Sequence, residues 1–173
     1  MSRYLALLRG VNVGGRNVVA MAELRELFSS LGHADVTTFI QSGNVLFDAP
    51  ERPAVAALEA AIESRFGISV VVAVRAPAEL DAAIAGNPFP DTDPARLHLG
   101  FPTASPVAGA LDRIDRDAFL PDRFALRGDH VYFELPNGMG RARLPAAVDR
   151  GLGGAMTVRN WKTASRLAEL ARA

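Results

Sequence analysis

The sequence predicts a mixed α/β protein in which one order of elements, β-α-β-β-α-β, occurs twice. Short β-branched runs alternate with segments whose apolar residues recur at helical spacing. Two-residue turn signals, Ser42-Gly43 and Gly128-Asp129, each separate two β-rich runs, as in a β-hairpin. Landmarks of the two halves differ by 86 positions, from Gly43 to Asp129 and from Gly67 to Gly153. Residue identity between the halves is slight, so we expect the duplication in the order of elements.

The first half opens with a strand over residues 3–9, because a short apolar run there ends at Gly10. Apolar residues then recur at helical spacing over residues 21–31 and stop at Gly32, a residue typical of helix C-termini. The remaining elements of this half are strands at 36–41 and 44–48, a helix from Pro53 to Gly67, a strand at 68–74 and a trailing helix at 77–85.

Residues 87–95 carry three prolines and are expected to form a linker. The second half then repeats the order, with a strand at 96–101, a helix at 104–114, a hairpin of strands at 123–127 and 130–135, a helix at 140–150 around Pro145, a strand at 155–158 and a final helix at 162–172. The pattern is that of two tandem ferredoxin-like repeats, each followed by an extra helix. We expect subdomains at 1–86 and 96–173, packed as one compact unit.

Composition excludes several classes of protein. Nineteen basic and nineteen acidic residues give a net charge of zero, which argues against broad electrostatic attraction to nucleic acid or to an anionic membrane. There are no cysteines, and the three histidines are far apart in sequence, so we expect no metal site and no cofactor. The apolar run of residues 4–8 is too short for a signal peptide or a membrane span. We expect a cytoplasmic protein.

Polar residues gather at one edge of the first predicted sheet. In a ferredoxin-like unit the end of the first strand and the turn between the second and third strands share an edge, so residues 10–20 and 41–44 should be neighbours. The expected ligand-binding residues of this edge are Arg9, Gly10, Asn12, Gly14, Gly15, Asn17, Gln41, Ser42, Gly43 and Asn44. They offer guanidinium, amide and backbone groups that suit an anion, but no His or carboxylate for proton transfer. The chemistry favours binding over catalysis.

Residues 10–17 also approach the phosphate-binding pattern GxxxxGK[ST], with Arg16 in place of Lys and Asn17 in place of the hydroxyl residue. The helical pattern starts near Met21 rather than at this step, so the helix N-terminus would not face a phosphate. A nucleotide P-loop is therefore disfavoured. A structural alternative stays open, in which Gly14 and Gly15 only permit positive φ and the asparagines only satisfy local backbone groups.

The segment Thr157–Trp161 supplies the single Trp of the chain just before the final helix. We expect Asn160 to be the N-cap, Trp161 the first helical residue and Arg159 an exposed cation at a strand end. Arg159, Asn160 and Trp161 could contact a base or sugar by charge and stacking. The alternative, favoured by the size of the ring, is that Trp161 anchors the final helix to the core.

Three stretches, "LLRGVNVGGRN", "TTFIQSGNVLF" and "TVRNWKTASRLAEL", together resemble a bacterial family of unknown function, DUF1697. The family pattern usually has Lys at Arg16, Pro at Ala20 and, more often, Tyr at Phe39. The resemblance implies a duplicated ferredoxin-like fold but no reaction. The motif residues that it implies are Arg9, Gly10, Asn12, Gly14, Gly15, Asn17, Gln41, Ser42, Gly43, Asn44, Thr157, Arg159, Asn160 and Trp161.

These observations predict a protein that binds a phosphorylated small molecule, a nucleotide or a short nucleic acid. Arg9 and Arg159 would hold anionic oxygens, while Asn12, Gln41 and Asn44 would recognise polar edges. One alternative is an enzyme acting on such a ligand, with Ser42 in the chemistry. Another is a structural module that forms a homodimer through its sheets.

Overall fold

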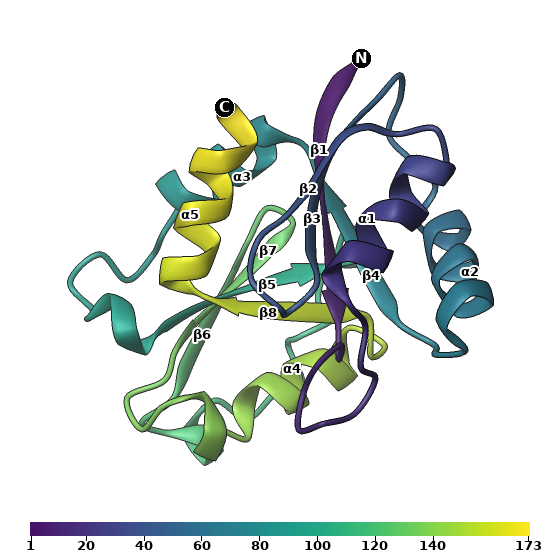
Figure 1. The fold of residues 1–173 in the computed structure, drawn as a ribbon. Helices are drawn as coiled ribbons and strands as arrows, with labels where there is room; N and C mark the ends of the chain where they lie inside the picture. The colour runs from purple at the N-terminus through teal and green to yellow at the C-terminus, as the bar shows by residue number, and fades with distance from the viewer. The chain divides into compact units, whose positions relative to one another are not determined.

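The computed structural model describes residues 1–173 and contains two four-stranded sheets (Figure 1). The chain divides into two compact units, Met1–Asp81 with Leu167–Ala173, and Ala82–Arg166. The first sheet and its helices are β1 (Ser2–Arg9), α1 (Met21–Ser30), β2 (Ala34–Thr38), β3 (Asn44–Ala49), α2 (Val55–Phe66), β4 (Val71–Arg75) and α3 (Pro77–Ala85). The later elements are β5 (Leu97–Pro102), β6 (Arg123–Arg127), β7 (His130–Glu134), α4 (Leu144–Gly151), β8 (Met156–Asn160) and α5 (Trp161–Arg172).

The first sheet has the strand order β2-β3-β1-β4, with every neighbouring pair antiparallel. This is the ferredoxin-like arrangement that the element order predicts, because β3 returns between β1 and β2. Helices α1 and α2 cover one face, where Phe28 and Phe47 pack with ring centroids 5.2 Å apart. Gly67 ends α2 in the left-handed conformation, as the sequence predicts.

The second sheet has the equivalent order, β6-β7-β5-β8, again antiparallel throughout. The helix expected at 104–114 is wrong, since turns and a 3₁₀ helix at Asp117–Phe119 connect β5 to β6. Gly109 has a φ of +77°, which no right-handed helix contains, and Pro106 lacks the backbone donor that a helix interior requires. The connection still reaches the core, because Leu111 is buried.

The duplication is visible in the register of the two sheets. Leu46 and Arg75 lie opposite Leu5, and Tyr132 and Arg159 lie opposite Leu99. The equivalent residues Leu46 and Tyr132 are 86 positions apart, as the hairpin landmarks predict. Arg75 of edge strand β4 and Arg159 of edge strand β8 are both buried. In each, Nη1 donates to the carbonyl of the preceding residue, at 2.9 Å for Arg75 and 3.0 Å for Arg159.

Some boundaries differ from those that the sequence predicts. β2 ends at Thr38 rather than Gln41, because Ile40 takes a φ of +52° and turns the chain out of the extended conformation. Pro145 does not disturb α4, since it lies in the first turn, where its missing donor is not needed. No helix is both long enough and apolar enough to span a membrane.

We expect Gly43→Ala to destabilise the protein more than Gly67→Ala. Both glycines have positive φ, +79° and +68°, so both changes add the strain of a left-handed residue. A Cβ at Gly43 would also lie 2.5 Å from Val11 Cγ2 and 2.9 Å from Leu8 Cβ, whereas one at Gly67 would meet nothing within 4 Å. The extra loss for Gly43→Ala should be about 1–3 kcal/mol in urea unfolding. Equal losses would contradict this close approach.

Candidate functional site

Residues 10–20 fold into a small hairpin at the end of β1. Gly14 and Gly15 both have positive φ, 57° and 73°, as a two-residue hairpin turn of the type I′ class requires. The Arg16 N–H donates to the Val13 carbonyl at 3.0 Å, and the Asn12 N–H donates to the Asn17 carbonyl at 3.1 Å. The glycine pair therefore forms the tip of a defined hairpin.

The Asn12 side chain joins this hairpin to the turn that precedes β3. Its Nδ2 donates to the Val19 carbonyl at 2.9 Å and to the Gln41 carbonyl at 2.8 Å, and its Oδ1 accepts from the Val19 N–H at 2.8 Å. The prediction that residues 10–20 and 41–44 are neighbours is confirmed. Because both amide hydrogens are engaged, Asn12 holds the two segments together and has no donor left for a ligand.

The other two asparagines also bond backbone and turn groups, Asn44 from a buried position and Asn17 from an exposed one. Asn44 is fully buried, and its Nδ2 donates to the Phe39 carbonyl at 2.9 Å and to Ser42 Oγ at 3.0 Å. Asn17 Nδ2 donates to the Gly10 carbonyl at 3.0 Å. The structural alternative left open by the sequence therefore holds for the asparagine amides, which satisfy backbone and turn groups.

We call residues 9–18 and 39–44 the braced-loop surface. Its exposed members include Arg9, Arg16 and Gln41, together with the glycine tip. Three apolar side chains are also exposed on it, Val13 by 62%, Val18 by 75% and Ile40 by 49%. Residues 7–22 and 36–47 contain no Asp, Glu or His, so these segments carry only positive charge.

The C-terminal motif has a structural role that differs in part from the prediction. Arg159 is buried, not exposed, because β8 pairs with β5 and its side chain folds back to bond Thr157 Oγ1 at 2.8 Å. Burial lowers the pKa of the Arg159 guanidinium to about 10, which still leaves it protonated at neutral pH. The predicted cap is confirmed, since Asn160 Oδ1 accepts from the Thr163 N–H at 2.8 Å.

Trp161 is the first residue of α5, as predicted, and is half-buried. Its ring centroid lies 6.4 Å from that of Tyr132, whose hydroxyl donates to the Ala83 carbonyl at 2.7 Å. These contacts support the anchoring interpretation of Trp161. The C-terminal motif lies in the second compact unit, and the braced-loop surface lies in the first. A single site shared by the two therefore stays a prediction.

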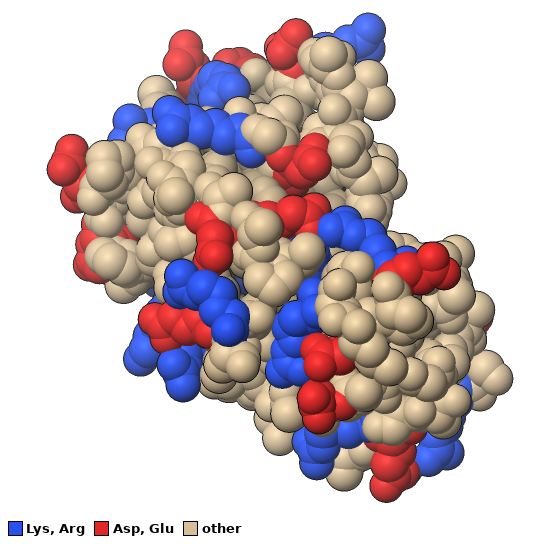
Figure 2. Space-filling model, turned by 90° about the horizontal axis from the view of Figure 1, so that it is seen from above, with Lys and Arg blue, Asp and Glu red and all other residues tan.

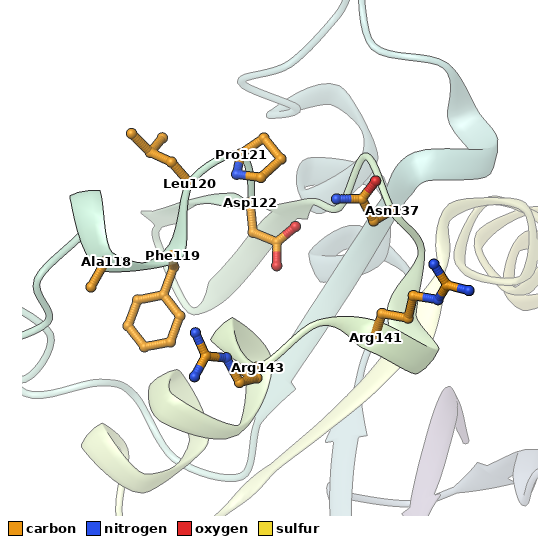
Figure 3. Close-up of a pocket in the computed structure, with 8 residues that line it drawn as sticks. All are labelled: Ala118, Phe119, Leu120, Pro121, Asp122, Asn137, Arg141 and Arg143. Carbon is orange, nitrogen blue, oxygen red and sulfur yellow. The ribbon is translucent and has the colours of Figure 1, made fainter.

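The sequence interpretation missed a pocket of about 340 Å³ in the second unit (Figure 3). Residues 118–122, which precede β6, and residues 137–143, which follow β7, form its walls. Arg141 and Arg143 contribute guanidinium groups, and Asp122 contributes a carboxylate whose pKa is raised by burial. The paired arginines after a glycine-rich turn were the available signal, but only the fold brings residues 118–122 against them.

We expect Asn12→Gly to destabilise the protein more than Asn17→Gly. Both asparagines have positive φ, 54° and 49°, so glycine relieves the same backbone strain at each position. Asn12 loses three side-chain hydrogen bonds and Asn17 only one, so the difference should be about 2 kcal/mol at ~1 kcal/mol per bond. Chemical denaturation measures both, and a difference near zero would show that the Asn12 bonds do not hold the hairpin.

We expect Asn160→Ala to cost about 1 kcal/mol of unfolding free energy, because the first turn of α5 loses its cap. Asn160→Asp keeps an acceptor at the same place and should retain most of the stability. Thermal unfolding distinguishes the two, and an equal loss for both variants would contradict the capping role.

Comparison with known proteins places these features in a family. A solved structure of a conserved bacterial protein from Streptococcus pneumoniae has the same fold, with a TM-score of 0.72 over 100% of this chain and 99% of that chain. The two sequences are 22% identical, so this likeness concerns the fold alone. No curated protein matches the chain. The family model for the proteins of unknown function DUF1697 matches residues 1–132, which include the hairpin, its braces and the turn before β3. The chain belongs to the DUF1697 family.

Proposed function

We propose that the braced-loop surface binds a phosphate-bearing ligand, and that a short single-stranded nucleic acid suits it best. The observation that carries the proposal is the Asn12 amide, which fixes two segments 29 residues apart in one rigid, exposed surface. A surface that is already ordered loses little conformational entropy when it binds.

Charge at this surface favours an anionic partner. Arg9 and Arg16 are exposed at the hairpin, and the segments that form it contain no carboxylate to oppose a phosphate. Gly14 and Gly15 carry no side chain, so a ligand can approach their backbone N–H groups closely. Elsewhere, basic and acidic side chains are interspersed over the face shown in Figure 2, in keeping with the net charge of zero. Binding is therefore expected to depend on a local contact rather than on a broad basic face.

The exposed apolar side chains favour an extended ligand over a small anion. Val13, Val18 and Ile40 expose 49–75% of their surface beside the arginines. A projecting hairpin offers no enclosure for a small molecule, but it can lie along a strand whose bases and sugars have apolar faces. The amide of Gln41 is exposed and supplies both a donor and an acceptor for base edges.

Binding is proposed rather than catalysis. Residues 7–22 and 36–47 contain no Asp, Glu, His, Cys, Lys or Tyr, so the surface brings no general acid or base of its own. The Ser42 hydroxyl accepts a hydrogen bond from Asn44 inside the turn, which gives it a structural use.

Arg16→Ala should weaken binding of a short fluorescent single-stranded oligonucleotide. If Arg16 contacts one phosphate, the slope of log K against log salt should become shallower by about 0.7. Arg113→Ala, which removes an exposed arginine in the second unit, is the matched control. Fluorescence anisotropy over a salt series measures both, and the proposal fails if wild type does not bind or if the two variants lose affinity equally.

The exposed apolar side chains also suit a homodimer, which is the second candidate function. In that case Val18→Ser should dissociate the dimer. Neither the wild type nor Arg16→Ala should then bind the oligonucleotide. Sedimentation velocity of wild type and Val18→Ser distinguishes the two functions.

A further inference from the structure

The pocket in the second unit forms where the two ends of one hairpin meet. Arg123 of β6 lies opposite Glu134 of β7, so the chain entering β6 and the chain leaving β7 share one end of the sheet. Residues 118–122 and 137–143 therefore face each other; the first segment contains the end of the 3₁₀ helix Asp117–Phe119, and the second contains the whole of the 3₁₀ helix Met139–Arg141. Figure 3 shows the Asp122 carboxylate pointing into the space between them, with the Arg143 guanidinium beside the Phe119 ring.

The polar side chains of this pocket are not used by the fold. Arg141, Arg143, Asn137 and Asp122 line it and make no side-chain hydrogen bond or ion pair. Other arginines of the same unit are engaged: Arg116 donates to the Phe124 carbonyl at 2.8 Å, Arg123 bonds Glu134, and Arg127 donates to the Gly86 carbonyl at 3.1 Å. The pocket thus presents two guanidinium groups and an amide that remain available to a ligand.

An apolar pocket of about 270 Å³ adjoins it and shares Leu120 and Asp122 as lining residues. Phe89, Phe124 and Leu144 supply its apolar walls. The Arg116 guanidinium lies 3.9 Å from the centroid of the Phe124 ring, and that of Arg123 lies 5.1 Å from the centroid of the Phe89 ring. Guanidinium planes and aromatic rings together are the surfaces on which nucleic-acid bases stack.

Asp122 separates the two pockets and constrains the chemistry of a ligand that spans them. Burial raises the pKa of its carboxyl, but a carboxylate there opposes an anion placed directly against it. It suits instead a hydroxyl donor located between an anionic group and a planar group. A ribose carries such hydroxyls between a phosphate and a base.

We propose that these two adjoining pockets form a nucleoside monophosphate site. The phosphate, with a charge near −2, lies against Arg143, and Arg141, whose guanidinium points away from Arg143 in Figure 3, adds positive charge from the other side of the pocket. The ribose hydroxyls donate to Asp122, and the base enters the pocket walled by Phe89 and Phe124. Each pocket has the size of a small-molecule subsite, and neither depends on the braced-loop surface, which lies in the other compact unit.

Isothermal titration of the full-length chain with AMP, GMP, CMP and UMP tests the proposal. At least one nucleotide should bind, and inorganic phosphate and the matching nucleoside should each bind more weakly than the nucleotide. Arg143→Ala should weaken nucleotide binding about ten-fold or more, because it removes a charged hydrogen bond, and Arg141→Ala should weaken it by a smaller factor, because it removes positive charge alone. Phe89→Ala should weaken binding of the nucleotide and the nucleoside but not that of inorganic phosphate.

Arg113→Ala removes an exposed arginine of the same unit outside both pockets, and should leave the affinity unchanged. Arg143 immediately precedes α4, so Arg143→Ala could disturb folding as well as binding. Arg143→Lys, which keeps the positive charge, and a circular dichroism spectrum of each variant distinguish lost binding from lost folding. The proposal is overturned if no nucleotide binds or if the pocket variants bind as tightly as Arg113→Ala. It is also overturned if indole-3-acetate, an aromatic carboxylate without ribose or phosphate, binds and the nucleotides do not. Arg16→Ala should not change nucleotide affinity, so failure here and failure of the oligonucleotide proposal are separate results.

Discussion

The connection from β1 to α1 is long and lies outside any regular strand or helix. Its backbone N–H and carbonyl groups must therefore find hydrogen-bond partners elsewhere. Asn12 meets this constraint by bonding both the Val19 N–H and the Val19 carbonyl, while its second amide hydrogen reaches the Gln41 carbonyl. An unpaired backbone group in this half-buried region would be destabilising. The same three bonds fix the direction in which the glycine hairpin projects, so the position of Arg16 depends on them, whereas Arg9 is placed by the pairing of β1 with β4.

The two repeats keep one sheet architecture and diverge in the connection between their first two strands. In the first unit this connection contains a hairpin and α1, whereas in the second it contains turns and a single 3₁₀ helix. Part of each proposed site lies on this connection. The braced-loop surface forms at its beginning, where β1 ends, and the second-unit pocket forms at its end, just before β6. Because no α-helix forms in this connection of the second unit, residues 118–122 line a pocket.

The sequence predicted those features that depend only on residues close together in the chain. Hairpin turns, the Gly67 cap and the Asn160 cap all follow from which residues tolerate positive φ or accept a hydrogen bond at a helix start. The neighbourhood of residues 10–20 and 41–44 also followed, because it is a consequence of strand order. Arg159 could not be placed in this way, since its burial depends on which side chains cover β8 after folding. The pocket was missed for a similar reason: its two walls are separated in sequence by a whole hairpin.

Motif membership alone does not identify a ligand contact in this protein. Asn12, Asn44 and Asn160 are all motif residues, and the amide or carbonyl groups of each are engaged in bracing the fold. A glycine-asparagine motif of this kind preserves a shape, and the groups that the shape leaves exposed carry the binding chemistry. Arg16 makes no ion pair and projects from the braced hairpin, so its charge is available whichever anion binds. Lys, the residue usual in the family at this position, would keep the charge but not the two-pronged geometry of guanidinium. A phosphate contact that needs charge alone is therefore consistent with either residue, whereas the unpaired arginines of the second-unit pocket offer bidentate contacts that Lys could not replace.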